Sequence, residues 1–227
     1  MRLPFMPETW SMVLPTLGVG LALSIWGLWS HRTVATASGV LVLVVAALML
    51  NFFRDFERPL PQGLGPKTMV SPADGHVVLV RVVREDMHLK EDCLQIAIFM
   101  NPLDNHVQRV PYPGTVTEKK YYPGEYLAAY NDKADLVNEQ SHLVVRLDPP
   151  AGSSVSPGSI VLKQIAGMLC HRVRTDATEG QHVVQGDRFG RILLGSRVDV
   201  FLPKEFQPMV KVGQKVVAGQ TVLGELP

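Results

Sequence analysis

Three short stretches of the 227-residue chain carry side chains suited to nucleophilic and acid–base chemistry. In "RILLGSRVDVFLP", Gly195 and Ser196 interrupt an apolar, strand-like run with a small residue and a hydroxyl. In "FMNPLDNHVQRVPYPG", Asp104 and His106 lie between a predicted strand and a Pro-Gly turn, and in "SPADGHV" Asp74 stands in a Pro-x-Asp-Gly turn. Serine is a weak nucleophile that needs a neighbouring base, and a histidine oriented by an acid is a common solution.

Each stretch also has a purely structural explanation. An aspartate before glycine often forms a turn by accepting backbone hydrogen bonds. A single loop histidine is commonly structural or solvated, and the dipeptides Gly152-Ser153 and Gly158-Ser159 repeat the same letters within predicted loop. The residues alone therefore leave both a catalytic and a structural interpretation open.

Two long apolar runs precede these stretches. The runs from Thr9 to Ser30 and from Thr33 to Phe53 contain no charged residue, and only His31 and Arg32 separate them. Each is about as long as the ~20 residues that cross a bilayer as a helix. A secretory signal has a shorter apolar core and no second long run after it, and helices buried in a soluble core usually show a polar face. We therefore predict a membrane-associated helical hairpin over residues 1–55.

Charged residues and cysteines limit the possible functions further. Arg2 precedes the hairpin and Arg54 and Arg58 follow it, which predicts both ends on the cytoplasmic face of a cell membrane. The net charge is +1 and no block of lysine and arginine is present, so we expect no nucleic-acid partner. Cys93 and Cys170 are too few for a disulfide framework and lack metal-ligand spacing, so we expect core thiols and no metal.

The rest of the chain has the composition of a linker followed by a β-rich domain. Residues 56–66 are rich in proline and glycine, which is typical of a linker. Beyond them, β-branched segments alternate with turn-forming clusters, so we predict a mostly β (α+β) domain over residues 67–227. The strand-like segments are "HVVLVRVV" from His76, "LQIAIFM" from Leu94, "SHLVVRL" from Ser141, "SIVLKQIAG" from Ser159 and "RILLGSRVDVFLP" from Arg191.

A short repeat lies near the C-terminus. "GQHVVQG" at Gly180–Gly186 returns as "GQKVVAG" at Gly213–Gly219, which predicts two copies of one small unit. The pattern resembles the hairpins of biotinyl- and lipoyl-type barrel-sandwich domains, and "SPADGHVV" resembles their other recurring strand. This favours an alternative without catalysis, a carrier or membrane adaptor. Against a carrier, no lysine stands at the tip of a tight hairpin, and Lys215 lies within the repeat itself.

Taken together, these segments resemble the phosphatidylserine decarboxylases in their short bacterial form, over nearly the whole chain. No single motif is decisive, but their order and spacing are specific. The motifs are "FFRDFERPLP", "SPADGHV", "FMNPLDNHVQRVPYPG", "YYPGEY", "NEQ", "QIAG", "GDRFGRILLGSRVDVFLP" and "VKVGQKVVAGQTVLGEL".

The resemblance implies a proenzyme that cuts itself between Gly195 and Ser196, giving a large chain of residues 1–195 and a small chain of residues 196–227. It assigns Ser196 as the nucleophile, His106 as its base and Asp74 as the acid that orients His106. It also implies that Ser196 becomes a pyruvoyl cofactor, which forms a Schiff base with the amine of phosphatidylserine and takes the electron-sink role of pyridoxal phosphate. No pyridoxal phosphate and no metal are then expected.

The sequence departs from longer relatives at two positions. They have threonine where this chain has Arg197, and a second histidine where this chain has Arg109. Arg109 is therefore a candidate substrate-binding residue, suited to the lipid phosphate. Asp104 is a second substrate-binding candidate, and His76 and His171 are weaker catalytic candidates. Besides phosphatidylserine in the membrane, a related serine-headgroup lipid, such as an archaeal-type ether lipid, stays open as the substrate.

Overall fold

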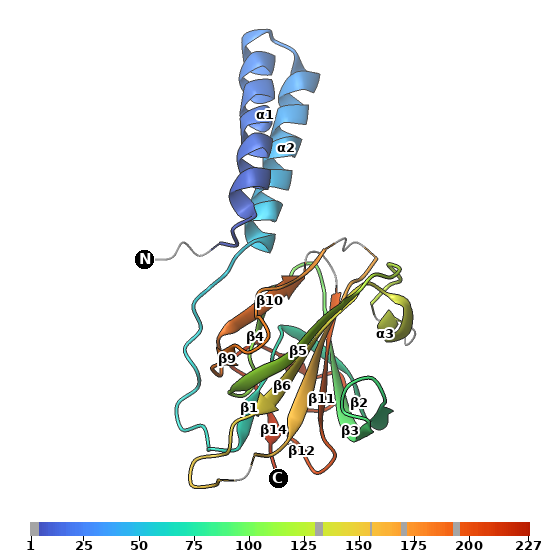
Figure 1. Ribbon diagram of the computed structural model, residues 1–227. Coiled ribbons are helices and arrows are strands. Elements are labelled where there is room, and N and C mark those ends of the chain that lie inside the picture. The colour runs from blue at the N-terminus through green and yellow to red at the C-terminus, as the bar shows by residue number, and fades with distance from the viewer. Residues whose placement is uncertain (1–4, 130–133, 155, 169–171, 193–195) are drawn as a thin grey trace. The chain divides into compact units, whose positions relative to one another are not determined.

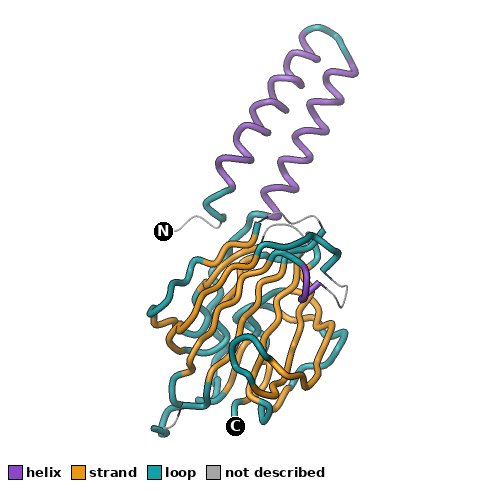
Figure 2. The backbone as a smooth tube through the Cα atoms, turned by 45° about the vertical axis from the view of Figure 1, so that its right-hand side comes forward, coloured by secondary structure: helices purple, strands orange, loops and turns teal. Residues whose placement is uncertain are grey.

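The computed structural model describes residues 5–227 except 130–133, 155, 169–171 and 193–195. The chain forms two compact units, residues 1–57 and residues 58–227. Figure 2 shows helices in the first unit and strands in nearly all of the second. Residues 58–66, which the sequence predicts as linker, belong to the second unit, where the Nε2 of Gln220 donates to the carbonyl of Pro59.

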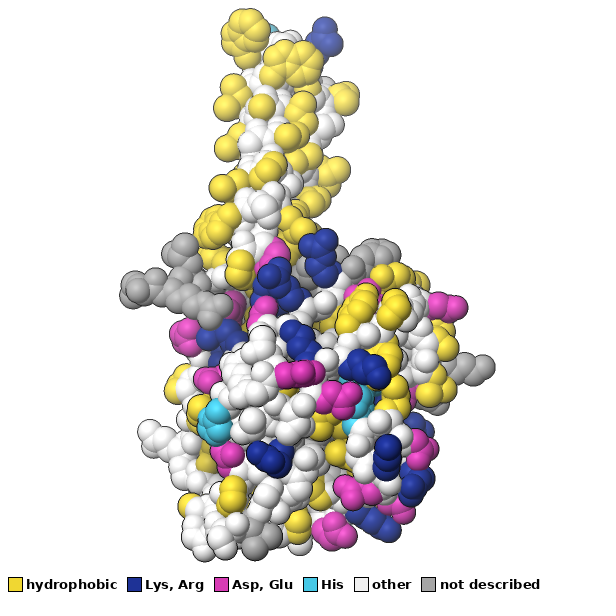
Figure 3. Space-filling model, viewed as in Figure 1, with side chains coloured by type: hydrophobic (Ala, Val, Ile, Leu, Met, Phe, Trp, Pro, Cys, Tyr) yellow, Lys and Arg dark blue, Asp and Glu magenta, His cyan; other side chains and the backbone are white. Residues whose placement is uncertain are grey.

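The first unit is a hairpin of two helices, α1 (Thr9–Trp29) and α2 (Thr33–Phe52). Both are long and apolar enough to cross a membrane, and little of either is buried. Their outward side chains are largely hydrophobic, whereas charged side chains gather on the second unit (Figure 3). The predicted hairpin is therefore confirmed as a structure.

Small residues allow the two helices to pack closely. A Cβ atom on Gly39 of α2 would lie 2.3 Å from the Oγ of Ser24 on α1, and one on Gly27 of α1 would lie 2.4 Å from the backbone nitrogen of Thr36. Helices that pack in lipid use such small residues because close backbone approach replaces the hydrophobic effect there. These glycines fit a hairpin surrounded by lipid.

The second unit is an antiparallel β domain with one short helix, α3 (Ala134–Val137), which confirms the predicted mostly β class. One sheet of eight strands has the order β13-β2-β3-β11-β7-β6-β5-β9 and curls into a half-barrel, and two three-stranded sheets have the orders β1-β14-β12 and β4-β10-β8 (Figure 1). The strands are β1 (Thr68–Val70), β2 (Gly75–Glu85), β3 (Glu91–Met100), β4 (Val107–Arg109), β5 (Gly114–Tyr122), β6 (Gln140–Leu147), β7 (Ser159–Ile165), β8 (Val173–Thr175), β9 (His182–Val183), β10 (Arg188–Ile192), β11 (Ser196–Pro203), β12 (Gln207–Pro208), β13 (Lys215–Val216) and β14 (Val222–Glu225).

The two halves of the large sheet are built alike, so that equivalent strands follow one another from each edge toward the centre. Matching β13, β2, β3 and β11 with β9, β5, β6 and β7 pairs the strands one to one, and the small sheets match around their central strands β14 and β10. We call residues 68–100 with 196–225 half A, and residues 107–192 half B. The domain is thus two similar halves, with the whole of half B inserted in the sequence between the two stretches of half A.

Matching hydrogen bonds support this correspondence. In half A the N–H of Val77 donates to Gln214 (2.9 Å), and in half B the N–H of Val116 donates to Gln181 (2.9 Å). Both ladders are irregular just after these valines. The predicted sequence repeat occupies equivalent turns in the two halves, and its glycines all have left-handed φ angles, which favour glycine. These are Gly180 (78°), Gly186 (87°), Gly213 (87°) and Gly219 (70°).

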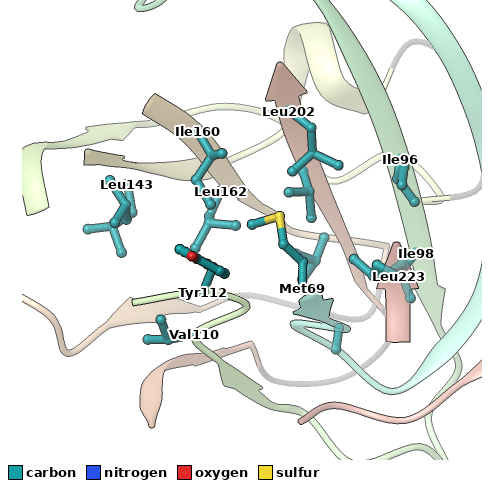
Figure 4. Close-up of a cluster of buried hydrophobic side chains, with 14 of the residues drawn as sticks. Met69, Ile96, Ile98, Val110, Tyr112, Leu143, Ile160, Leu162, Leu202 and Leu223 are labelled. Carbon is teal, nitrogen blue, oxygen red and sulfur yellow. The ribbon is translucent and has the colours of Figure 1, made fainter. Parts of the chain in front are cut away.

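The inner face of the large sheet holds the main core, and both halves contribute to it. Residues alternate along each strand, so one set faces the core and the next faces outward. Figure 4 shows this cluster of buried side chains. Half A contributes Met69, Ile96, Ile98, Leu202 and Leu223, and half B contributes Val110, Tyr112, Leu143, Ile160 and Leu162.

Candidate functional site

Ser196 is the first residue of β11 and lies on the inner face of the large sheet. Its strand alternates so that Val198, Val200 and Leu202 enter the core, and Ser196 follows the same phase. The side chain is fully buried, and its Oγ atom has no hydrogen-bond partner among the described residues. A buried hydroxyl without a partner is destabilising by about 1–3 kcal/mol, so this serine is not explained by structural need.

One segment of the chain contacts both flanks of the predicted cut site. Gly195 lies outside the described residues. On its upstream side, the N–H of Ile192 donates to the carbonyl of His106 (3.2 Å), and on its downstream side Ser196 is paired with Met100 across the ladder of β11 and β3. Residues 100–106, which join the two halves, therefore contact the chain on both sides of residues 193–195.

The imidazole of His106 is fully buried, and its Nδ1 lies 2.9 Å from the carbonyl oxygen of Asp104. A carbonyl can only accept a hydrogen bond, so Nδ1 carries a proton. In the neutral ring this leaves the lone pair on Nε2, which is the nitrogen able to take a proton. The turn at Asp104 thus fixes the tautomer that a general base requires.

Asp74 lies just before β2, where the chain packs tightly against β3, because a Cβ atom on Gly75 would lie 2.1 Å from the carbonyl oxygen of Phe99. Its carboxylate forms a two-point ion pair with Arg58, with Nη2 at 2.8 Å from Oδ2, and accepts the N–H of Ala218 at 2.8 Å. Within the described residues its hydrogen bonds go to these groups and not to His106. The sequence-predicted acid is therefore paired with an arginine that the sequence analysis used only for the orientation of the hairpin and did not place in the site.

The candidate substrate-binding residues are both buried. Arg109 is 4% exposed, and its Nη1 donates to the carbonyl of Gly186 (2.7 Å). Asp104 is 8% exposed, and its Oδ2 accepts the N–H of Asn101 (3.0 Å), which shapes the turn that carries His106. Of the weaker candidates, His76 is exposed at the start of β2 and His171 lies outside the described residues.

A chain of polar side chains inside the domain leads away from His106, and sequence reasoning missed it. The Nε2 of Gln108 donates to the carbonyl of His106 (2.7 Å), and the Nε2 of Gln164 donates to Gln108 (2.8 Å). Thr175 then links Gln164 to Ser141. The sequence signal for this chain of hydrogen bonds was one glutamine within each of two apolar segments, "HVQRV" and "LKQIAG". A buried glutamine must form hydrogen bonds, and here Gln164 holds Gln108, which in turn holds the main chain of His106 just before β4.

A cavity formed by described residues lies on the outer face of the large sheet. It measures about 460 Å³ and is lined by residues of β2, β3, β7, β11 and the α3 region. None of the sequence-predicted site residues lines it. Among the described residues, no group of three or more His, Cys, Asp or Glu side chains is arranged to hold a metal ion.

Comparison with known proteins identifies close relatives. A family model described as phosphatidylserine decarboxylase matches residues 45–224. The chain is 38% identical over 213 residues to the phosphatidylserine decarboxylase proenzyme of Symbiobacterium thermophilum, covering 94% of this chain and 93% of the relative. It is 39% identical to the corresponding proenzyme of Salinibacter ruber (92% and 87% covered) and 42% identical to that of Syntrophus aciditrophicus (82% and 84% covered).

Proposed function

The chain belongs to the phosphatidylserine decarboxylase family, and from this we propose that it decarboxylates phosphatidylserine to phosphatidylethanolamine with a pyruvoyl group made from its own Ser196. The observation that carries the assignment of Ser196 is its buried Oγ atom, which has no partner among the described residues and lies beside the segment that carries His106. As in its relatives, the chain is made as a proenzyme.

In the proposed cut, the Oγ of Ser196 attacks the carbonyl carbon of Gly195. The C–N bond breaks, the amine of residue 196 is freed and an ester joins the two residues. Loss of the Cα proton of residue 196 then expels the Gly195 carboxylate and leaves dehydroalanine. Water hydrolyses its imine form, which releases ammonia and gives the ketone of a pyruvoyl group. Every step uses only the chain's own atoms and water.

His106 supplies the base for this cut in our proposal. The Asp104 carbonyl holds the Nδ1 proton, so the Nε2 lone pair can accept the proton of the Ser196 hydroxyl. Asp74 is proposed to assist from the neighbouring loop. In this structure its charge is balanced by Arg58, so an effect of Asp74 on His106 would run through that pair or follow its opening. Asp104 and Arg109 fit positioning better than lipid binding, because both side chains are buried and form hydrogen bonds to the backbone.

Once formed, the pyruvoyl ketone would supply an electron sink for the pair released when the substrate loses carbon dioxide. The buried position of Ser196 fits this chemistry, because the apolar side chains of β11 and β3 make the surroundings less polar, and charges that develop there interact more strongly than in bulk water. The Nε2 of His106, which takes a proton during the cut, is the group that we propose returns a proton to the substrate carbon.

Both chains are proposed to stay in one domain after the cut. The small chain would contain β11–β14, and these strands pair with β1, β2, β3 and β7 of the large chain. The ladders that hold β11 do not use the bond between residues 195 and 196. We therefore expect the two chains to purify together and to separate only on denaturation.

The decisive experiment is the intact mass of purified protein beside two serine variants. Wild-type protein should give a large fragment that ends at Gly195 and a small fragment that begins with pyruvoyl, whereas Ser196→Ala should stay one chain. Ser159→Ala is the matched control, because it removes the hydroxyl of the Gly158-Ser159 pair and should be cut normally. Active wild-type protein that is uncut would refute the proposal.

A trapping experiment tests the cofactor separately. Borohydride added with phosphatidylserine should attach the lipid amine covalently to the small fragment, and hydroxylamine should abolish activity. An adduct on a lysine of the large fragment would contradict a pyruvoyl mechanism. Running the same trap with an ether-linked serine lipid tests the alternative substrate. Family membership leaves the non-catalytic adaptor without support.

The hairpin associates the chain with the membrane, and we propose that its ends face the cytoplasm, on the support of Arg54 and Arg58 just after α2. Deleting residues up to Asn51 should move the protein to the soluble fraction with its β domain folded. A high-salt wash should not release the full-length chain, because apolar burial is scarcely screened by salt. Complete release by salt would show an electrostatic attachment instead.

A further inference from the structure

A buried ion pair lies immediately beside the proposed cut, on the opposite face of β11 from Ser196. Arg197 is 2% exposed and Asp199 is fully buried. The guanidinium contacts the carboxylate at two points, with Nε 2.6 Å from Oδ1 and Nη2 2.6 Å from Oδ2. Such two-point pairs fix geometry as well as charge, so the two side chains hold each other in one orientation along β11.

Further contacts tie this pair to three other elements. The Nε2 of Gln95 on β3 donates to Asp199 (2.7 Å), and the Nε of Arg81 on β2 donates to Gln95 (3.0 Å). From α3, the carboxylate of Asp135 lies 3.8 Å from the Nη2 of Arg197. We call Arg197, Asp199 and Gln95 the outer-face clamp. It links the first residues of β11 to the neighbouring strand β3 and, through the contact with Asp135, to the short helix α3.

Half B shows that the fold itself does not need this clamp. The register places Ser159 and Val161 of β7 at the positions equivalent to Arg197 and Asp199. Val161 belongs to a small apolar cluster on the outer face, together with Cys93, Val144 and Phe201. At these two positions the same strand in the other half therefore carries no charge, and its buried cation, Lys163, lies two residues further along. The costly pair occurs only where the strand begins at the nucleophile.

We propose that Arg197 is a positioning residue, which through Asp199 and Gln95 holds residue 196 in place after the chain is cut. This inference rests on the proposed cut between Gly195 and Ser196. Before the cut, residue 196 is held covalently on both sides. After it, residue 196 is a free strand end, and its position depends on the ladders to β3 and β7 and on the clamp. The clamp should therefore matter more for turnover than for cutting.

The test measures cutting and turnover separately in the full-length protein. Arg197→Met removes the charge, and Arg197→Met/Asp199→Leu removes both charges so that no buried carboxylate is left unpaired. For each variant we would measure the half-time of cutting, the number of ketones per cut chain by phenylhydrazine, and kcat and KM on phosphatidylserine in mixed micelles.

We expect cutting half-times within about threefold of wild type and nearly one ketone per cut chain. Turnover should fall, with kcat roughly 10- to 100-fold lower and KM little changed, because misplacement by about 1 Å can reduce rates about 100-fold. Gln95→Leu, which removes one tie, should give a smaller loss of kcat. Arg197→Lys should fall between wild type and Arg197→Met, since a lysine keeps the charge without the two-point contact.

Lys163→Met is the matched control. Lys163 is a buried cation on the same outer face, paired with Glu85 on β2 and lying opposite Asp199 on the next strand. It should lower stability without a selective loss of kcat. The inference is overturned if the double variant turns over at the wild-type rate, if cutting slows by the same factor as turnover, or if Lys163→Met shows the same selective loss. Wild-type protein that stays uncut would instead refute the proposed function itself.

Discussion

Half A and half B of the β domain share a backbone design but differ in the side chains that could do chemistry. Val198 pairs with Ile98 across the ladder in half A, and Ile160 pairs with Val145 in half B, so Val198 corresponds to Ile160. Two residues earlier along the chain in each half, the counterpart of Ser196 is Gly158. The counterpart of Gly75 is Gly114, since Val216 and Val183 pair with them in equivalent ways. Asp74 therefore corresponds to Pro113. Half B has neither the hydroxyl nor the carboxylate.

The comparison separates the features that form the fold, which both halves share, from the candidate site residues, which only one half has. The strand order, the ladder irregularities and the glycine turns occur in both halves, so they belong to the scaffold. The Ser196 hydroxyl, the Asp74 carboxylate and the Arg197–Asp199 pair occur only in half A. His106 lies on the connection between the halves. Reciprocal hydrogen bonds close that junction, from Val70 to Pro111 (3.1 Å) and from Arg109 to Pro72 (2.8 Å).

The sharpest way to break the comparison is to change the two equivalent turn residues, Asp74 and Pro113. Asp74→Asn keeps the shape but removes the charge, which leaves Arg58 without its counter-ion and weakens any support for the base. We expect cutting to slow by roughly 10- to 100-fold, within or just below the range for acid–base groups. Pro113→Ala should be cut at the wild-type rate. The half-time of proenzyme on a denaturing gel measures both.

Equal slowing in the two variants would show that the turns act through folding alone. Arg58→Met provides a second control, because it releases Asp74 without removing it. If the Arg58 pair only restrains Asp74, this variant should be cut at least as fast as wild type. If the pair is needed to build the site, it should slow cutting as Asp74→Asn does.

The next comparison concerns the glycines that follow these turn residues. A Cβ atom on Gly75 would lie 2.1 Å from the carbonyl of Phe99, and one on Gly114 would lie 2.4 Å from the carbonyl of Arg146. Both alanine variants should be destabilised, since backbone must move. Gly75→Ala should lose more, by about 1–3 kcal/mol beyond Gly114→Ala, because only Gly75 has a left-handed φ angle (141°).

Thermal unfolding in detergent measures this difference, with Ser196→Ala as the uncut background. Gly213→Ala and Gly180→Ala are controls in equivalent turns, since nothing lies within 4 Å of either added Cβ atom. Each should be destabilised by about 1–3 kcal/mol from the left-handed φ angle alone. If Gly114→Ala lowered the stability more than Gly75→Ala did, the close contacts and φ angles of the two glycines would not account for their contributions to stability.

Local patterns in the sequence predicted part of this organisation. The apolar runs, free of charge over a bilayer's width, predicted the hairpin, and the repeated "GQ-x-VV-x-G" predicted two equivalent turns. The pairing of the halves could not be predicted. Half B is one continuous stretch, but half A is assembled from two stretches that lie on either side of it in the sequence, and nothing local specifies that β11 inserts between β3 and β7.

The sequence predicts a set of candidate site residues, which stays a prediction, but it does not predict the contacts that these residues make. Motifs identified Ser196, His106 and Asp74, yet the partner of Asp74 is an arginine 16 positions earlier, in a segment that reads as linker. The acceptor for the Nδ1 of His106 is a main-chain carbonyl, which no side-chain motif can reveal. Opposite charges at Arg197 and Asp199 in an apolar strand were visible, and their i, i+2 spacing places them on one face.

The smallest expected effect tests a side chain that half B adds to the scaffold. Tyr112 in half B corresponds to Ala73 in half A, and both lie in the core. The Tyr112 hydroxyl donates to the carbonyl of Pro66 (2.6 Å), which ties the start of the domain to half B. Tyr112→Phe should therefore reduce the free energy of unfolding at neutral pH by about 1 kcal/mol, the net value of one hydrogen bond.

The same residue gives a pH dependence with a defined sign. Burial, and then the charge of Asp148, raises the pKa of Tyr112 above its ordinary value near 10. The folded state thus holds this proton more tightly than the unfolded state, so the contribution of Tyr112 is fully present below pH 10 and is lost as the pH rises through the folded pKa. Tyr112→Phe cannot ionise. Its deficit relative to wild type, measured by denaturant unfolding in the Ser196→Ala background, should shrink above pH 10. A deficit that stayed constant to pH 11 would mean that the hydroxyl ionises as readily in the folded chain as in the unfolded one, and that its contact with Pro66 does not stabilise the protonated form.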